Sequence, residues 1–331
     1  MFSRGHSETS YDTTIEKGTL LKKLDPVAGE RIVSTIAPAD LRAHLHSTLV
    51  ARCDELRASL VGVATDPFAL LDSIVGPAEH VIRRIPPGAQ KILRVARDEN
   101  ASFGHLSDLV SDDPVVVRGL LRLANSIVYA GPDRAPTTSI IEAIRRVGST
   151  GVESVVLRCM VEGMFCQPGG EFQPMADLVW AHMTRTAPIG RVLGPLFGMN
   201  QDEAFLVAMM HDVGKLVVFD RLGALRTSKR REPRLTRAFM EAVLHAVHEP
   251  LGAIAALEWG LGNVAAGAIG SHHRREVFTF SDLASQLIFA TERVDMARTS
   301  GTPIMSEPWI LDGGLVVSEA AITAALATKP H

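Results

Sequence analysis

Residues 208–219, AMMHDVGKLVVF, place a histidine and an aspartate side by side within an otherwise apolar stretch. His211 and Asp212 are followed at once by Gly214 and Lys215. An apolar stretch of this length is expected to be buried, and buried polar side chains need partners. Two hypotheses follow. Either the pair binds a divalent metal where the helix distorts or ends, with Gly214 letting the chain turn, or hydrogen bonds hold both side chains in a core.

The composition is typical of a large folded protein. The chain has 331 residues, 46% of them hydrophobic, and a formal net charge of −3. Its length allows one large domain or two of ordinary size, and its charge disfavours nucleic acid as a partner. No apolar run approaches the roughly 18 residues of a membrane-spanning helix, and the N-terminus is too polar for a signal peptide. We therefore expect a cytoplasmic protein without membrane contact.

Helical patterns follow one another along the chain, whereas strand signals are nearly absent, so the predicted fold class is all-α. Asp113-Pro114 is a helix-start signal, because the carboxylate caps the first turn and proline is tolerated there. Earlier in the chain, one apolar stripe predicts a helix that packs within the domain or against a second copy. This stripe consists of Leu41, Leu45, Leu49, Cys53, Leu56 and Leu60. In the second half we expect helices near 174–196, 201–222, 235–247, 250–260, 262–273 and 281–298.

Helical patterns and loop-like stretches divide the chain into four regions. We expect a flexible tail (1–36), a helical extension (37–84), a central helical unit (85–297) and a C-terminal tail with a short helix (298–331). Gln167-Pro-Gly-Gly170 is the most loop-like stretch of the central unit and separates its halves, 85–166 and 171–297.

Candidate metal ligands are concentrated in the second half. They are histidines and carboxylates, the ligand types of hard or borderline divalent cations, and they would converge from different helices of a bundle. Taken singly, each histidine is more often a core or surface residue, so spacing alone leaves convergence open. The candidates are His182, His211, Asp212, His248, His272, His273 and Glu292.

Several segments carry, in one order along the chain, the motifs of a known family. They are DDPVVVRGLLRLANSIVYAG (112–131), SIIEAIRRVGSTGVESVVL (139–157), WAH ending at His182, AFLVAMMHDVGKLVVF (204–219), HEPLGAIAALEWGLG (248–262) and SHH (271–273). Together they resemble the HDOD domain, a degenerate relative of the HD and HD-GYP metal-dependent phosphohydrolases. The resemblance covers about residues 85–297. It implies a multi-helix HD-like bundle, the second half, packed with an N-terminal helical subdomain.

The resemblance also bears on activity. HDOD domains are regarded as bacterial signalling or regulatory modules, whereas HD-GYP domains hydrolyse cyclic di-GMP and carry a Gly-Tyr-Pro motif after the histidine pair. The only tyrosines here are Tyr11 and Tyr129, so the HD-GYP class is excluded. The HD pattern implies a last ligand in an Ala-Asp of the final helix. This chain has Thr291-Glu292 there, with Asp295 as the other candidate.

We therefore expect a bacterial signal-transduction protein that acts through protein contacts and carries a vestigial metal site. The alternative is a metal-dependent phosphohydrolase, a phosphodiesterase acting on a nucleotide or cyclic nucleotide with Fe, Mn or Mg. In that case Asp212 would be catalytic and Lys215 would contact a substrate phosphate, although Lys215 can equally be a solvated lysine near a helix end. An unidentified regulatory protein, a second copy in a homodimer and a nucleotide are the partners left open.

Two further features have predicted structural roles. The basic stretch RTSKRREPRLTR (226–237) is expected to be a solvated loop rather than a phosphate lid or docking loop. Asn125 interrupts an apolar helix, so we expect its side chain to tie neighbouring helices together rather than to bind a ligand.

Overall fold

The computed structural model describes residues 38–60, 65–130, 135–165, 170–273, 283–301 and 319–328. Every regular element in these ranges is a helix, which confirms the all-α prediction. The predicted tail 1–36 lies outside the described residues. The helices are α1 (Pro38–Ser59), α2 (Thr65–Ile74), α3 (Ala78–Val81), α4 (Pro87–Ala96), α5 (Phe103–Ser111), α6 (Pro114–Ala124), α7 (Ile127–Ala130), α8 (Ile140–Phe165), α9 (Gln173–Leu193), the 3-10 turn η2 (Gly194–Phe197), α10 (Gln201–Met210), α11 (Val213–Lys229), α12 (Arg237–Glu258), α13 (Gly262–Ile269), α15 (Leu283–Ser300) and α17 (Glu319–Leu326).

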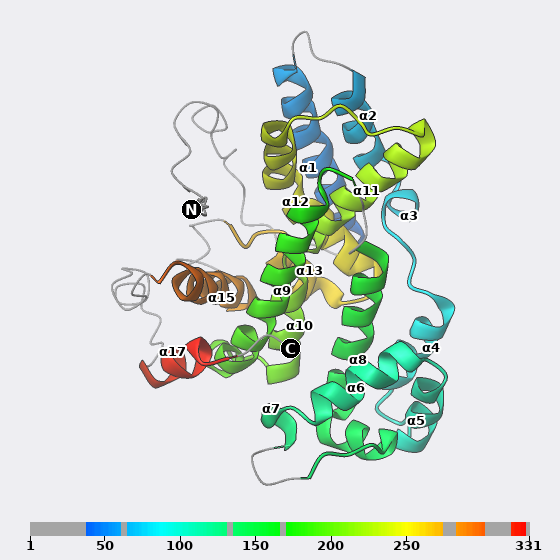
Figure 1. The fold of residues 1–331 in the computed structure, drawn as a ribbon, viewed down its shortest axis with the longest axis vertical. Helices are drawn as coiled ribbons and strands as arrows, with labels where there is room; N and C mark the ends of the chain where they lie inside the picture. The colour runs from blue at the N-terminus through cyan, green and yellow to red at the C-terminus, as the bar shows by residue number, and fades with distance from the viewer. Residues whose placement is uncertain are drawn as a thin grey trace, which may run out of the picture.

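The helices form two groups joined by α8. Helices α4 to α7 pack around the lower part of α8, and α9 to α13 with α15 form the larger group above (Figure 1). Helix α8 also contacts α10 and α11 and so belongs to both groups. Within the described residues, none of the helices combines the length and apolar character that a bilayer crossing requires.

Local sequence signals explain several helix ends. The Asp113 carboxylate accepts hydrogen bonds from the backbone N–H groups of Val115 (2.9 Å) and Val116 (3.2 Å), and Pro114 occupies the first turn, as predicted. Gly148 has φ 71° and breaks α8 into two segments, because glycine adopts this backbone conformation without steric cost. These ends depend on neighbouring residues only, which is why they were predictable.

Helix α1 packs along α12 of the larger group. The residues of its predicted stripe are buried from Leu41 through Leu56, and Leu60 is partly buried. This apolar face therefore packs within the chain.

Asn125 has the structural role that was predicted. Its Nδ2 donates to the backbone oxygen of Thr137 (2.8 Å), and its Oδ1 accepts from the backbone N–H of Thr137 (2.7 Å). The pair connects the end of α6 to the segment that leads into α8.

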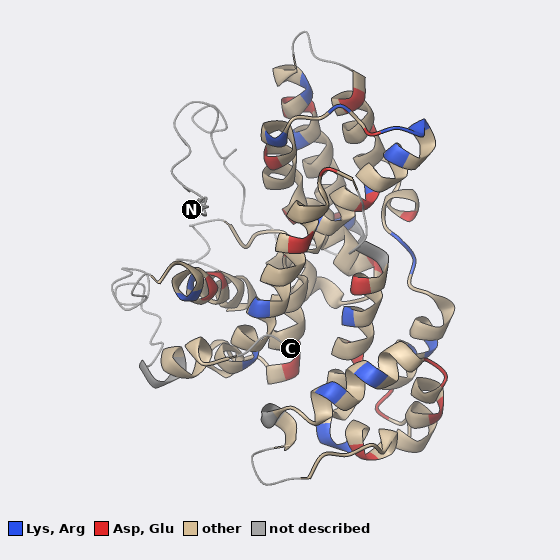
Figure 2. Ribbon diagram, viewed as in Figure 1, with Lys and Arg blue, Asp and Glu red and all other residues tan. Residues whose placement is uncertain are grey.

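The basic stretch after α11 is more than a solvated loop, because it anchors α2. Lys229 and Arg231 bind the carboxylate of Asp66 at 2.5 and 2.8 Å, and the backbone N–H of Arg234 donates to it at 2.7 Å. Asp66, in the first turn of α2, is only 1% exposed. Figure 2 shows basic residues at the end of α11 and along the chain leading to α12. The pattern did not reveal this role, because Asp66 lies more than 160 residues earlier.

Two predicted helix boundaries differ from the structure. The helix expected over 201–222 is two helices, with His211 and Asp212 at the break. The helices expected over 235–247 and 250–260 are one helix, α12, which continues through Pro250. Proline within a helix removes one hydrogen bond, so α12 requires other contacts at this point.

Candidate metal centre

All seven predicted ligand side chains lie in one cluster, and they come from five parts of the chain. Groups of their nitrogen and oxygen atoms lie within 4.8 Å of one another. His182 comes from α9, His211 and Asp212 from the α10–α11 junction, His248 from α12, His272 and His273 from the turn after α13, and Glu292 from α15.

Gly214 has a different role from the one predicted. It lies in the first turn of α11 rather than in a turn of the chain, and it faces α12. A Cβ at this position would overlap the backbone oxygen of His248 and lie 2.7 Å from the backbone nitrogen of Gly252. The missing side chain therefore allows the backbones of α11 and α12 to touch, which places Asp212 beside His248.

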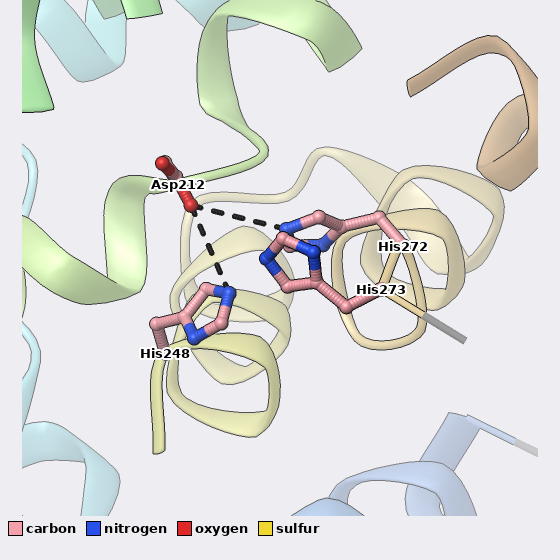
Figure 3. Close-up of side chains that lie close together, drawn as sticks. All are labelled: Asp212, His248, His272 and His273. Carbon is pink, nitrogen blue, oxygen red and sulfur yellow. Dashed lines mark ion pairs between the residues drawn. The ribbon is translucent and has the colours of Figure 1, made fainter. Parts of the chain in front are cut away.

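Asp212 occupies the middle of the cluster and is 1% exposed. Its Oδ1 lies 3.8 Å from Nε2 of both His248 and His272, as Figure 3 shows, with the His273 ring beside that of His272. Its Oδ2 lies 3.7 Å from Nε2 of His211 and 3.9 Å from Nε2 of His182. Each carboxylate oxygen thus faces its own pair of histidines.

The buried histidines are held with Nε2 directed at the cluster. In three of them Nδ1 faces a backbone carbonyl oxygen, which can only accept, so Nδ1 carries the proton and Nε2 presents a lone pair. These contacts are His211 to Ala208 (2.8 Å), His248 to Leu244 (2.7 Å) and His272 to Ile269 (2.8 Å).

Asp295 orients His182 rather than joining the cluster. Its Oδ2 accepts from Nδ1 of His182 at 2.9 Å, while Arg185 and Arg298 bind the same carboxylate at 3.0 and 2.9 Å. The carboxylate that faces the cluster is Glu292. Its Oε1 lies 3.7 Å from Nε2 of His211, and its Oε2 lies 3.8 Å from Nδ1 of His273. The structure therefore favours Glu292 over Asp295 at the position of the last HD ligand.

Several buried atoms of the cluster lack a hydrogen-bond partner among the described residues. They are Asp212 Oδ1, His248 Nε2 and His272 Nε2. In addition, Nε2 of His182 and Nε2 of His211 face each other at 3.2 Å, although both nitrogens are acceptors when their Nδ1 atoms donate. Unpaired buried acceptors are unfavourable, and a cation among them would satisfy all of them at once. The residues present thus fit a divalent metal.

The electrostatics agree with a ligand role. Burial lowers the pKa of His211 and His248 well below the usual value, so both are neutral, as metal ligands must be. Burial alone would raise the pKa of Asp212. Two positively charged or polar neighbours outweigh this effect and lower the pKa well below its ordinary value: Lys215, whose Nζ lies 2.6 Å away, and His211. Asp212 is therefore ionised.

Two other groups of the cluster have raised pKa values. For His272, burial is outweighed by Asp212, Glu292 and Glu249, and these carboxylates raise its pKa. Burial raises the pKa of Glu292. Both groups therefore hold protons more tightly than usual, and a metal that binds here would displace them.

The cluster is partly accessible. The side chains of His182, Lys215, His273 and Glu292 are partly exposed, whereas those of Asp212 and the remaining histidines are buried. Lys215 pairs with Asp212, so it is neither a purely solvated lysine nor remote from the cluster.

The fold and the cluster together define an HD-like helical protein with a candidate metal centre. The model of the HDOD domain matches residues 82–275, more than half of the chain. The chain belongs to the HDOD domain family.

Solved structures share the fold. A protein of Shewanella amazonensis, provisionally assigned as a metal-dependent phosphohydrolase, superposes with a TM-score of 0.58 at 16% identity, covering 86% of this chain and 99% of its own. A second protein of that organism, provisionally assigned as a phosphohydrolase, has a TM-score of 0.56 at 23% identity and covers 78% and 93%. A protein of Marinobacter aquaeolei, provisionally assigned to signal transduction, has a TM-score of 0.57 at 17% identity and covers 88% and 65%. At these identities the likeness concerns the fold alone.

One curated relative is an uncharacterized protein of Treponema pallidum, 23% identical over 201 residues. The match spans 58% of this chain and 37% of the relative's length.

Proposed function

We propose that this protein is a divalent-metal-dependent phosphohydrolase that acts on a phosphodiester of the nucleotide class. The observation that carries this proposal is the position of Asp212, whose two oxygens face two separate histidine pairs. A carboxylate placed in this way suits a bridge between two cations. Two solved structures that share this fold are provisionally assigned as phosphohydrolases, so the fold is compatible with the proposed activity.

The donor set divides into two halves around Asp212. His182, His211 and Glu292 would hold one cation, and His248, His272 and His273 the other. The high share of imidazole favours manganese or iron over magnesium, which prefers oxygen ligands. When bound, such cations act as Lewis acids toward a phosphoryl oxygen and lower the pKa of water.

The charges of the centre favour an anionic substrate. Two divalent cations would carry more positive charge than Asp212 and Glu292 carry negative charge. The other five donors are imidazoles, which add no negative charge. Lys215 adds a partly exposed ammonium group 2.6 Å from Asp212 Oδ2. That group would bind a phosphate oxygen, and the side chains of Glu292 and His273 are also partly exposed.

The test combines metal content with turnover. Protein expressed with added iron and manganese and purified without chelator is analysed by mass spectrometry, then assayed with bis(p-nitrophenyl) phosphate and cyclic dinucleotides. We expect close to two ions per chain and metal-dependent hydrolysis, both lost in Asp212→Ala.

Asp220→Asn is the matched control, because Asp220 is also a buried aspartate of this region but pairs with Arg83 and Arg221 instead of histidines. Metal binding without turnover of any phosphodiester would refute the hydrolase proposal. Equal metal content in Asp212→Ala would refute the site itself.

A regulatory protein that acts through protein contacts is the second candidate. Membership of the HDOD family supports it, as does one further observation: no ligand of the cluster comes from the described part of residues 87–165. Helices α4 to α8 therefore have no part in holding metal and are available for another task. Stoichiometric metal without turnover would favour this candidate.

A further inference from the structure

Helix α1 lies outside the HDOD match yet reaches the metal centre. The match begins at residue 82, whereas α1 covers residues 38–59 and packs along α12, the helix that carries His248. Arg52 of α1 is the residue that makes this contact polar. Its guanidinium donates to two acceptors of α12, both close to His248 in sequence.

The first acceptor is a carbonyl group that proline leaves without its helical donor. Pro250 has no N–H, so the backbone oxygen of Ala246, four residues earlier, cannot receive its usual hydrogen bond. Arg52 Nη1 donates to this oxygen at 2.8 Å. This contact compensates for the lost bond and explains how α12 continues through Pro250, two residues after His248.

The second acceptor connects α1 to another candidate ligand. Arg52 Nη1 lies 3.2 Å from Glu249 Oε2, and Glu249 Oε1 accepts from the backbone N–H of His273 at 3.2 Å. Glu249 is 5% exposed, so this carboxylate is nearly enclosed by its partners. Arg52, Glu249 and the backbone of His273 thus form a continuous chain of charge-assisted hydrogen bonds.

We propose that Arg52 is a positioning residue of the metal centre. It stabilises α12 at Pro250 and, through Glu249, holds His248 and His273 against Asp212. An N-terminal helix outside the HDOD match therefore completes the half of the centre formed by His248, His272 and His273. The inference rests on the proposed function only in that the cluster binds metal, since it requires no turnover.

The test is a titration of the metal-free full chain with Mn²⁺ by isothermal titration calorimetry. Loss of a group that orients metal ligands weakens binding by about 10–100-fold. We expect a loss of this size for Arg52→Met at one of two sites, with the site formed by His182 and His211 retained. Arg52→Lys keeps the charge and one contact, so its affinity should lie between those of the wild type and Arg52→Met.

Arg42→Met is the matched control. Arg42 also joins α1 to α12, through a 3.1 Å ion pair with Glu258, but makes no contact with the cluster. We expect its Mn²⁺ affinities to equal those of the wild type. A purely structural role of Arg52 would lower the melting temperature of the metal-free protein and leave both affinities unchanged.

The outcomes separate this inference from the proposed function. Wild-type affinities in folded Arg52→Met, or equal weakening in Arg42→Met, would overturn the role of Arg52 and leave the metal centre intact. Absence of Mn²⁺ binding by the wild type would overturn both. If Arg52→Met does not fold, Glu249→Gln decides, since it keeps an acceptor for His273 but loses the ion pair. Wild-type affinity in that variant would refute the inference.

Discussion

Replacing Gly214 by alanine tests how the metal centre is assembled. The added Cβ would overlap the backbone oxygen of His248, and it would lie 2.7 Å from Gly252 N and 2.8 Å from His248 C. Carbon contacts are optimal at about 3.5–4.0 Å, so α11 and α12 must separate by roughly 1–1.5 Å. These atoms belong to the backbone and cannot rotate away.

The expected effects concern both stability and metal binding. Overpacking of this kind lowers the free energy of unfolding by about 1–3 kcal/mol. For a chain of this size that corresponds to a drop in melting temperature of about 1.5–2 °C per kcal/mol. The same separation would move Asp212 away from His248, whereas metal–ligand distances tolerate only about 0.2 Å. We expect Gly214→Ala to lose metal as well as stability.

Gly163→Ala provides the control. Gly163 is an exposed glycine of α8, and a Cβ there would meet nothing within 4 Å. Because alanine is the better helix former, this variant should gain about 0.5–1 kcal/mol and keep its metal. Urea unfolding and metal analysis of the two variants check the prediction. Wild-type stability and metal content in Gly214→Ala would show that the helices do not touch as described.

Two further predictions concern the remainder of the fold. Hydrogen bonds from Arg231 and then Lys229 hold the pKa of Asp66 well below its usual range, so the contribution of Asp66 to stability is complete above the unfolded pKa of about 3.9 and is lost as the pH falls toward the folded value. Asp66→Asn should therefore be less stable than the wild type at pH 7, with a difference in melting temperature that shrinks from pH 5 to pH 2; a constant difference would contradict this assignment. Asn125→Ala removes both hydrogen bonds to the backbone of Thr137 and should lower the free energy of unfolding by about 1–3 kcal/mol in urea titrations, whereas no loss would show that water replaces both bonds.

Local patterns account for what was predictable. The helical class follows from apolar spacing, and the start of α6 from Asp113-Pro114, because capping involves only neighbouring residues. The seven candidate ligands were identified by residue type and by resemblance to the HDOD family. Their metal binding remains a proposal, but their convergence is now described.

The corrections share one cause. Gly214 was expected to make a turn, but its missing side chain is required by the backbone of His248 in α12, which lies more than 30 residues later in the chain. The interruption expected at Pro250 does not occur, because Arg52 donates a hydrogen bond to the carbonyl group that the proline leaves free. Arg52 lies nearly 200 residues before this carbonyl group, so the pattern around Pro250 did not reveal the contact. In each case the partner is distant in sequence and adjacent only after folding.

The sequence by itself determined the helical class, the family and the chemical types of the candidate ligands, since these depend on spacing and motif. Only the tertiary structure decided that Glu292 faces the cluster while Asp295 orients His182, although the two carboxylates are three residues apart on α15. It also decided that Asp212 lies between two histidine pairs. The physical reason is that a helix presents many side chains at similar spacing, and the packing of its neighbours determines which of them meet.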